Sequence, residues 1–158
     1  PPGDRPTVLI PFIQLEQGDR HLSFTRPSKT SSMSLDTVLD RLSEHEEIDG
    51  LMVIGSAVHN EVTPSSDYDL VILLSHIPVT LGIGHTYIAN RMTDLNFMTV
   101  DDLDQLLESE DPIDPYTPHG IAFLRMGDGN ITLDRPGRLG RAREIVNGRT
   151  KVRLFTER

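Results

Sequence analysis

The sequence lacks cysteine and tryptophan throughout its 158 residues. Without Cys the chain has neither a disulfide framework nor a thiolate zinc site, which fits a cytosolic protein. No apolar run approaches the roughly 18 residues that a bilayer-spanning helix needs. The Pro-rich start also lacks the basic segment and apolar core of a signal peptide. These absences predict a cytoplasmic protein with no membrane segment. Because the first residue is Pro1 rather than Met, we expect an excised or processed chain.

Basic residues are missing from the middle of the chain. No Lys or Arg occurs between Leu42 and Asn90, and nine of the 15 basic residues lie from Arg125 onward. Acidic residues fill that middle: Glu44, Glu46, Glu47, Asp49, Glu61, Asp67 and Asp69. A protein that binds long nucleic acid usually carries a basic stripe for the phosphates, so this pattern argues against such a partner. An acidic middle suits a divalent cation, which can in turn bind the phosphates of a small nucleotide.

Length and composition divide the chain into a leader and one domain. Residues 1–33 hold five of the 11 Pro and end in a Ser-rich cluster. Within this leader, residues 7–15 and 20–25 predict a hairpin at a sheet edge, with a flexible segment as the alternative. Residues 34–158 are enough for one compact domain and too few for two. We expect that domain to end in a basic helix.

Apolar spacing in residues 34–158 alternates between the helical and the extended period. Ser34 is expected to cap the first helix, and Asp101 a later one. The predicted helices cover 35–45, a segment after Asp101 and 137–146; the predicted strands cover 50–55, 67–74 and 91–100, with a hairpin of 120–125 and 130–133. Residues 81–84 are expected to form a Gly-rich connection. This order predicts an α/β (α+β) fold, a small mixed β-sheet with helices packed behind it.

The chemistry is concentrated where two predicted strands meet. Gly55-Ser56 follows an apolar strand, and ten residues later Asp67-Tyr68-Asp69 opens the next one. Side chains two apart on a strand share a face, so two carboxylates are expected side by side and require a cation. Mg²⁺ is the natural candidate, since it accepts one or two carboxylates and leaves room for water and phosphate oxygens. Asp94, on a neighbouring predicted strand, is the expected third carboxylate, with Asp101 and Asp102 as alternatives.

Each part of this pattern also has a simpler interpretation. A lone Asp-x-Asp is more often a solvated turn, but its spacing from Gly55-Ser56 favours a metal site. Gly55 permits close approach of a phosphate, and Ser56 offers a hydroxyl and a backbone N–H. No Arg follows Gly55-Ser56, so phosphate charge would fall to Mg²⁺, backbone N–H groups, Arg91 or the C-terminal basic helix. In that helix, Arg138, Arg141 and Arg143 are most simply a solvated face.

Gly55-Ser56, the spacer, Ser66-Asp67-Tyr68-Asp69-Leu70 and the later Asp94 resemble the nucleotidyltransferase fold of the DNA polymerase beta superfamily. The resemblance covers about residues 35–134 and is closest to minimal nucleotidyltransferases and aminoglycoside adenylyltransferases. It implies that Gly55, Ser56 and Ser66 hold the phosphates of a nucleoside triphosphate. It also implies that Asp67, Asp69 and Asp94 are catalytic and bind Mg²⁺, with Asp94 as metal ligand or general base.

The implied function is transfer of a nucleoside monophosphate, AMP from ATP or another NTP, to a hydroxyl acceptor. Only about 24 residues follow Asp134, which leaves little wall for an acceptor site. We therefore expect a partner protein, or a second copy in a homodimer, to complete it. The alternatives are an antitoxin-type protein that masks a helical partner, an antibiotic adenylyltransferase and an inactive relative.

Overall fold

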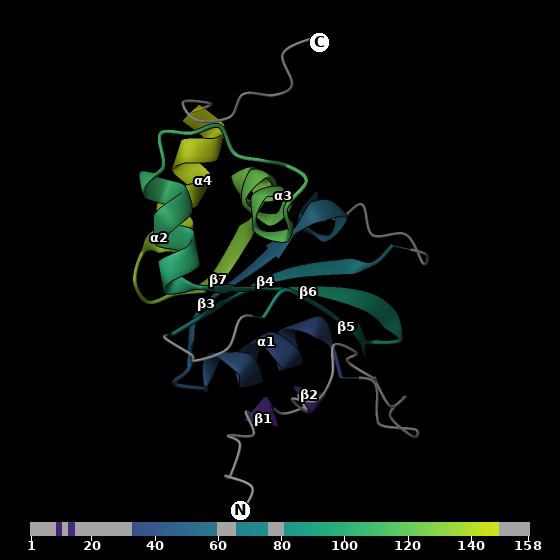
Figure 1. Cartoon of the computed structure of the whole chain (residues 1–158). Coiled ribbons are helices and arrows are strands. Elements are labelled where there is room, and N and C mark those ends of the chain that lie inside the picture. Colours follow the sequence, from purple (N-terminus) through teal and green to yellow (C-terminus); the bar gives the residue numbers. More distant parts are fainter. Residues whose placement is uncertain (1–8, 11–12, 15–32, 60–65, 76–80, 149–158) are drawn as a thin grey trace, which may run out of the picture.

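The computed structural model describes residues 9–10, 13–14, 33–59, 66–75 and 81–148. Its centre is a five-stranded sheet in the order β5-β6-β4-β3-β7 (Figure 1). The strands are β3 (Ile48–Ile54), β4 (Tyr68–Leu74), β5 (Ile83–Ile88), β6 (Arg91–Thr99) and β7 (Asn130–Asp134). β4 and β6 run parallel, and the other neighbours are antiparallel. The predicted α+β fold with a mixed sheet is confirmed.

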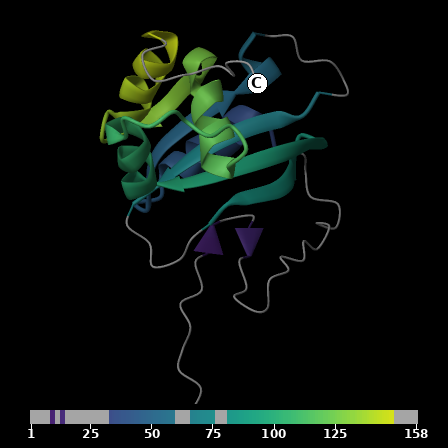
Figure 2. The same cartoon turned by 45° about the horizontal axis from the view of Figure 1, so that its top comes forward.

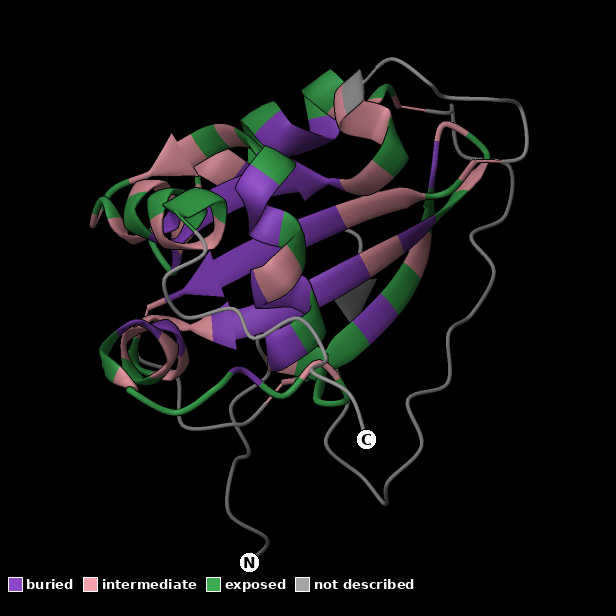
Figure 3. Cartoon of the chain, turned by 90° about the horizontal axis from the view of Figure 1, so that it is seen from above, coloured by how far each residue is buried: buried purple, intermediate pink, exposed green. Residues whose placement is uncertain are grey.

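Helices cover both faces of the sheet rather than one. α1 (Leu35–Ser43) packs on one face, and α2 (Val100–Glu108), α3 (Pro118–Arg125) and α4 (Arg138–Gly148) lie over the other (Figures 1 and 2). The central strands are therefore buried on both sides, as Figure 3 shows. Continuous apolar runs such as those of β3 and β4 are typical of strands in this position. None of the helices in the described ranges has the length and apolar character to cross a membrane.

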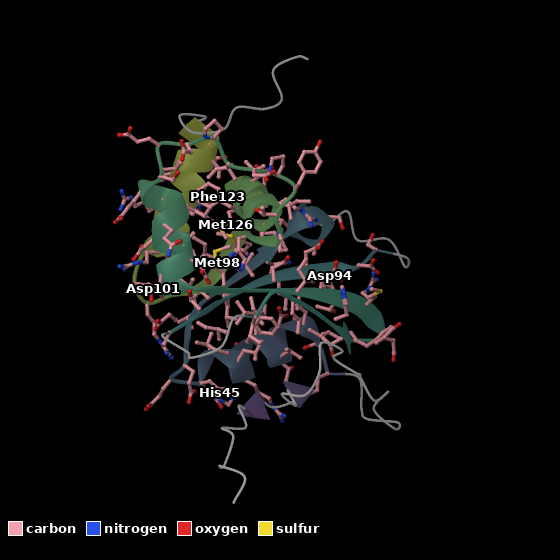
Figure 4. All side chains as sticks on the ribbon, in the orientation of Figure 1. His45, Asp94, Met98, Asp101, Phe123 and Met126 are labelled. Atoms are coloured by element: carbon pink, nitrogen blue, oxygen red, sulfur yellow. The ribbon has the colours of Figure 1, made fainter. Side chains whose placement is uncertain are left out.

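The alternation along each strand divides the core into two clusters. Leu95 and Phe97 of β6 pack on the α1 side, whereas Met98 packs on the other side with Phe123 and Met126. Figure 4 shows these last three between the sheet and the upper helices. The side chains of β6 are therefore divided between the two faces of the sheet. Asp94 lies four residues before Met98 on the same strand, so its side chain is on the same face, the one covered by α2–α4.

Two predicted helix starts can be checked against the caps. Ser34 caps α1, its hydroxyl accepting from the backbone N–H of Thr37 at 3.2 Å, as expected. α2 is capped by Thr99, so the predicted cap at Asp101 is wrong. Thr99 and Asp102 form a capping box in which each side chain accepts from the other's backbone N–H. Burial raises the pKa of Asp102, but the hydrogen bonds from Thr99 and the nearby His119 together leave that pKa below its ordinary value.

Residues 120–125 form the end of a helix, so the predicted hairpin with 130–133 is wrong. Thr117 caps α3, accepting from the backbone N–H of Gly120 at 3.0 Å, and Pro118 occupies the first turn. The apolar residues Ala122, Phe123 and Met126 follow helical spacing and are buried. β7 consequently pairs with β3, where Leu133 lies opposite Leu51.

The predicted Gly-rich connection at 81–84 is also wrong in its second half, because β5 begins at Ile83. β5 and β6 form a hairpin whose two turn residues, Ala89 and Asn90, have φ values of 49° and 61°. Positive φ at both positions is the geometry of a type I′ turn, which suits the twist of paired strands. Ala-Asn is a weaker sequence signal for this turn than Asn-Gly.

The structure describes only part of the leader. β1 (Leu9–Ile10) pairs antiparallel with β2 (Ile13–Gln14), so the predicted first arm at 7–15 contains two short strands rather than one. The predicted second arm at 20–25 lies outside the described residues.

Candidate active site

The candidate site lies at the end of the sheet where β3 ends and β4 begins. In the parallel pair, Asp69 of β4 is in register with Asp94 of β6. In the neighbouring antiparallel pair, His85 of β5 lies opposite Asp94. Residues in register share a face, so the three side chains form a row across adjacent strands about 4.8 Å apart. The sheet thus brings together two of the three predicted carboxylates on the face that α3 covers.

The third predicted carboxylate, Asp67, lies two residues before Asp69 and just outside the paired strand. β4 begins at Tyr68, so Asp67 precedes the strand, and it is exposed. The alternatives to Asp94 lie elsewhere. Asp101 and Asp102 are in the first turn of α2, which follows the far end of β6. Figure 4 shows Asp94 and Asp101 on opposite sides of the molecule.

Arg125, for which the sequence predicted no role, binds Asp69 with both ends of its guanidinium. Its Nη1 donates to Oδ1 at 3.0 Å and its Nη2 donates to Oδ2 at 2.9 Å. Asp69 is mostly buried, with 14% of its side chain exposed, whereas Arg125 is 41% exposed. Arg125 was missed because 120–125 was expected to be a strand. The cap at Thr117-Pro118 was the signal that could have identified α3 and its last residue.

Gly55 is the backbone neighbour of this ion pair. Its φ of +78° is a conformation that side chains other than hydrogen disfavour. A Cβ on Gly55 would stand 2.6 Å from Nη2 of Arg125 and 2.7 Å from Oδ2 of Asp69. Only glycine therefore fits between β3 and the short helix η1 (Gly55–His59) while the ion pair is in place.

Asp94 has a partner of its own in His85. The His85 Nδ1 and the Asp94 Oδ1 are 2.8 Å apart, and the side chains are 51% and 36% exposed. A pair this exposed contributes little to stability, about 1 kcal/mol or less. The chain itself therefore provides a basic partner for each carboxylate of the row.

The donor chemistry of the row fits a hard cation, with one condition. Mg²⁺ takes one or two carboxylates and fills its other positions with water and phosphate oxygens, so Asp69 is a suitable ligand, with Asp94 beside it. Within the described part of the chain, however, no three His, Cys, Asp or Glu residues are grouped to hold a metal. A metal at Asp69 would also compete with the Arg125 guanidinium for the carboxylate oxygens.

Arg91 contacts Ser66, one of the predicted phosphate-binding residues. Its Nη1 donates to the backbone carbonyl oxygen of Ser66 at 3.1 Å, and its guanidinium carbon is 5.6 Å from the centre of the Tyr68 ring. The C-terminal basic helix is engaged elsewhere. Arg138 donates from Nε to Asp104 at 2.6 Å and so ties α4 to α2. Arg91 is thus better placed for a phosphate than Arg138.

A hollow of about 760 Å³ lies on the α1 face of the sheet, bounded by α1, η1 and β7. Its floor includes Val53 and Tyr68, and its wall carries Asp36 and Asp40. None of the three predicted carboxylates lines it. Because Asp36 and Asp40 have the same charge sign as a phosphate, this hollow is a poor site for a nucleoside triphosphate.

Comparisons with known proteins show a distant structural likeness. No protein-family model matches the sequence, and no curated protein sequence is similar to it. Among solved structures, the chain is similar to a nucleotidyltransferase-like protein from Exiguobacterium sibiricum 255-15, with 12% identity and a TM-score of 0.46. The alignment covers 72% of this chain and 37% of that one. A likeness this distant does not transfer residue roles.

Proposed function

We propose that the protein is a Mg²⁺-dependent nucleotidyltransferase that moves AMP from ATP to a hydroxyl acceptor. The observation that carries this proposal is the register of Asp69 with Asp94, on adjacent parallel strands and beside the glycine turn at Gly55. Two carboxylates next to a close-approach backbone suit a metal-bound triphosphate. The spacing of Gly55-Ser56 from Asp67 and Asp69 supports the same conclusion.

In the proposed reaction each residue has a separate task. Asp67 and Asp69 would hold Mg²⁺, which neutralises the charge that develops on the phosphate oxygens. Gly55, Ser56 and Ser66 would orient the triphosphate. Asp94 would accept the proton of the acceptor hydroxyl, whose oxygen attacks the α-phosphorus as pyrophosphate leaves. The balanced products are an adenylylated acceptor, pyrophosphate and one proton.

The thermal stability of the protein tests this proposal directly. We expect Mg²⁺ and ATP together to raise the melting temperature, while either one alone has little effect, because the metal completes its coordination with phosphate oxygens. Differential scanning fluorimetry with each ligand alone and with both measures this. An equal shift with ATP in the presence of EDTA would contradict a metal-dependent site.

Asp94→Asn should separate binding from chemistry. We expect ATP with Mg²⁺ to bind nearly as well, while turnover falls by about 10²–10⁴-fold, because a general base acts in the transition state. Asp101→Asn is the matched control, since it removes a carboxylate at the other end of β6. If Asp94→Asn retains normal turnover, Asp94 is not the base.

A protein is the acceptor that the surface around Asp94 favours. Ile83, Tyr87 and Met92 are 40%, 62% and 40% exposed, and register places them on the same face as Asp94. Exposed apolar side chains grouped beside a site are typical of protein contacts. We expect labelled AMP to pass from ATP to a hydroxyl of a copurifying protein or a second copy, and slowly to aminoglycosides. Rapid, saturable labelling of an aminoglycoside would favour the antibiotic alternative instead.

A further inference from the structure

Asp69, a proposed metal ligand, is held by another cation in the structure described here. The Arg125 guanidinium occupies both oxygens of Asp69 at 2.9 and 3.0 Å. Bidentate arginine–carboxylate pairs are among the stronger hydrogen-bonded contacts in proteins, and Asp69 is largely shielded from water. A divalent cation must therefore compete with Arg125 for the same carboxylate.

Arg125 is also within reach of the turn at Gly55, and so of a second binding partner. A Cβ on Gly55 would lie 2.6 Å from Nη2, so the guanidinium touches the turn where the triphosphate is proposed to bind. The side chain is 41% exposed and extends from the last residue of α3. Rotation about its own bonds can therefore turn the guanidinium away from Asp69 while α3 stays anchored by Phe123, which is fully buried.

The sequence around Gly55 explains why such a residue is needed. Residues 56–66 contain no Lys or Arg, so the segment that joins Gly55 to Asp67 provides no cation for the triphosphate. Guanidinium groups match phosphate oxygens in the same two-point geometry with which they match carboxylates. Arg125 is thus already close to the site and has the right geometry for a phosphate.

We infer that Arg125 exchanges partners: it neutralises Asp69 in the free protein and binds a phosphate of the nucleoside triphosphate once the metal–nucleotide complex arrives. This inference rests on the proposed function. It explains why metal and nucleotide should bind together rather than separately, since the metal gains Asp69 only when Arg125 has a phosphate to bind. Metal alone must displace Arg125 without compensation, and so it binds weakly.

Substitution of Arg125 tests the exchange through two affinities that should move in opposite directions. In Arg125→Gln we expect Mn²⁺ alone to bind about tenfold more tightly, because Asp69 is freed. We expect ATP with Mg²⁺ to bind about tenfold or more weakly, because the phosphate loses its cation. Electron paramagnetic resonance of free Mn²⁺ gives the first affinity and isothermal titration calorimetry the second. Arg125→Lys, which keeps the charge but not the fork, should lie between the wild type and Arg125→Gln.

Arg141→Gln is the matched control, because it removes an exposed Arg of α4 and should change neither affinity. Unchanged affinities in Arg125→Gln, or a parallel loss of both, would overturn the exchange while leaving the proposed function intact. If Arg125→Gln does not fold, Arg125→Lys is measured by the same two readouts. Failure of the wild-type protein to bind ATP with Mg²⁺ would instead reject the proposed function, and the Mn²⁺ measurement would still test whether Arg125 neutralises Asp69.

Discussion

Replacing Asp69 with Asn is expected to reduce AMP transfer by about a thousandfold or more. The amide keeps the shape of the side chain but removes the charge that both the metal and Arg125 require. Transfer of radiolabel from α-labelled ATP to the acceptor measures the loss. Binding of Mg²⁺ with ATP should disappear in the same variant, which distinguishes Asp69 from a residue that acts only in the chemical step.

The fold should survive this substitution. The Asp69–Arg125 pair is partly exposed on the arginine side, so solvent screening limits its contribution to stability to about 1 kcal/mol. Asp104→Asn is the matched control, because Asp104 also accepts from an arginine, Arg138, at 2.6 Å. The Asp104→Asn variant should lose the ion pair with Arg138 and keep full activity. Normal activity in Asp69→Asn would reject the assignment of the site.

Replacing Phe123 with Ala is expected to lower the free energy of unfolding by about 3–5 kcal/mol. Phe123 has no exposed surface and packs in the cluster between the sheet and the α2–α4 layer (Figure 4). Truncation leaves a cavity that the surrounding strands and helices can fill only in part. Equilibrium unfolding in urea, followed by circular dichroism, measures the change.

Ile121→Ala provides the comparison within the same helix. Ile121 is 46% exposed, so its truncation should change the free energy of unfolding by about 0.5 kcal/mol or less. Similar small effects at both positions would contradict the placement of α3. Because α3 also carries Arg125, Phe123→Ala should weaken binding of ATP with Mg²⁺ even under conditions in which the protein remains folded.

Much of the sheet could be predicted from local patterns. The continuous apolar runs of β3 and β4 can be satisfied only by burial on both faces, and that requirement places them at the centre of the sheet. The helical spacing after Ser34 likewise leaves one apolar face to pack on those strands. In both cases a short segment carries its own structural signal.

Segments with mixed signals were predicted less well. Residues 120–125 are compatible with a short strand, and only the cap at Thr117 and the packing of Phe123 establish a helix. β5 contains glycine and exposed residues, and its structure depends on pairing with β6. Such segments take their conformation from neighbours that are distant in sequence, and so their own residues do not determine it.

The sequence by itself determined that the carboxylates of Asp67 and Asp69 are spaced to share a face, because the two-residue period of a strand is a local property. Asp69 and Asp94 share a face once β4 and β6 pair. Only the tertiary structure decided that Asp69 pairs with Asp94 in register and that Arg125, 56 residues further along the chain, binds Asp69. No local pattern encodes that contact. The packing of the buried side of α3 on the sheet determines where Arg125, the last residue of the helix, extends. The charge balance of the site is therefore a product of packing.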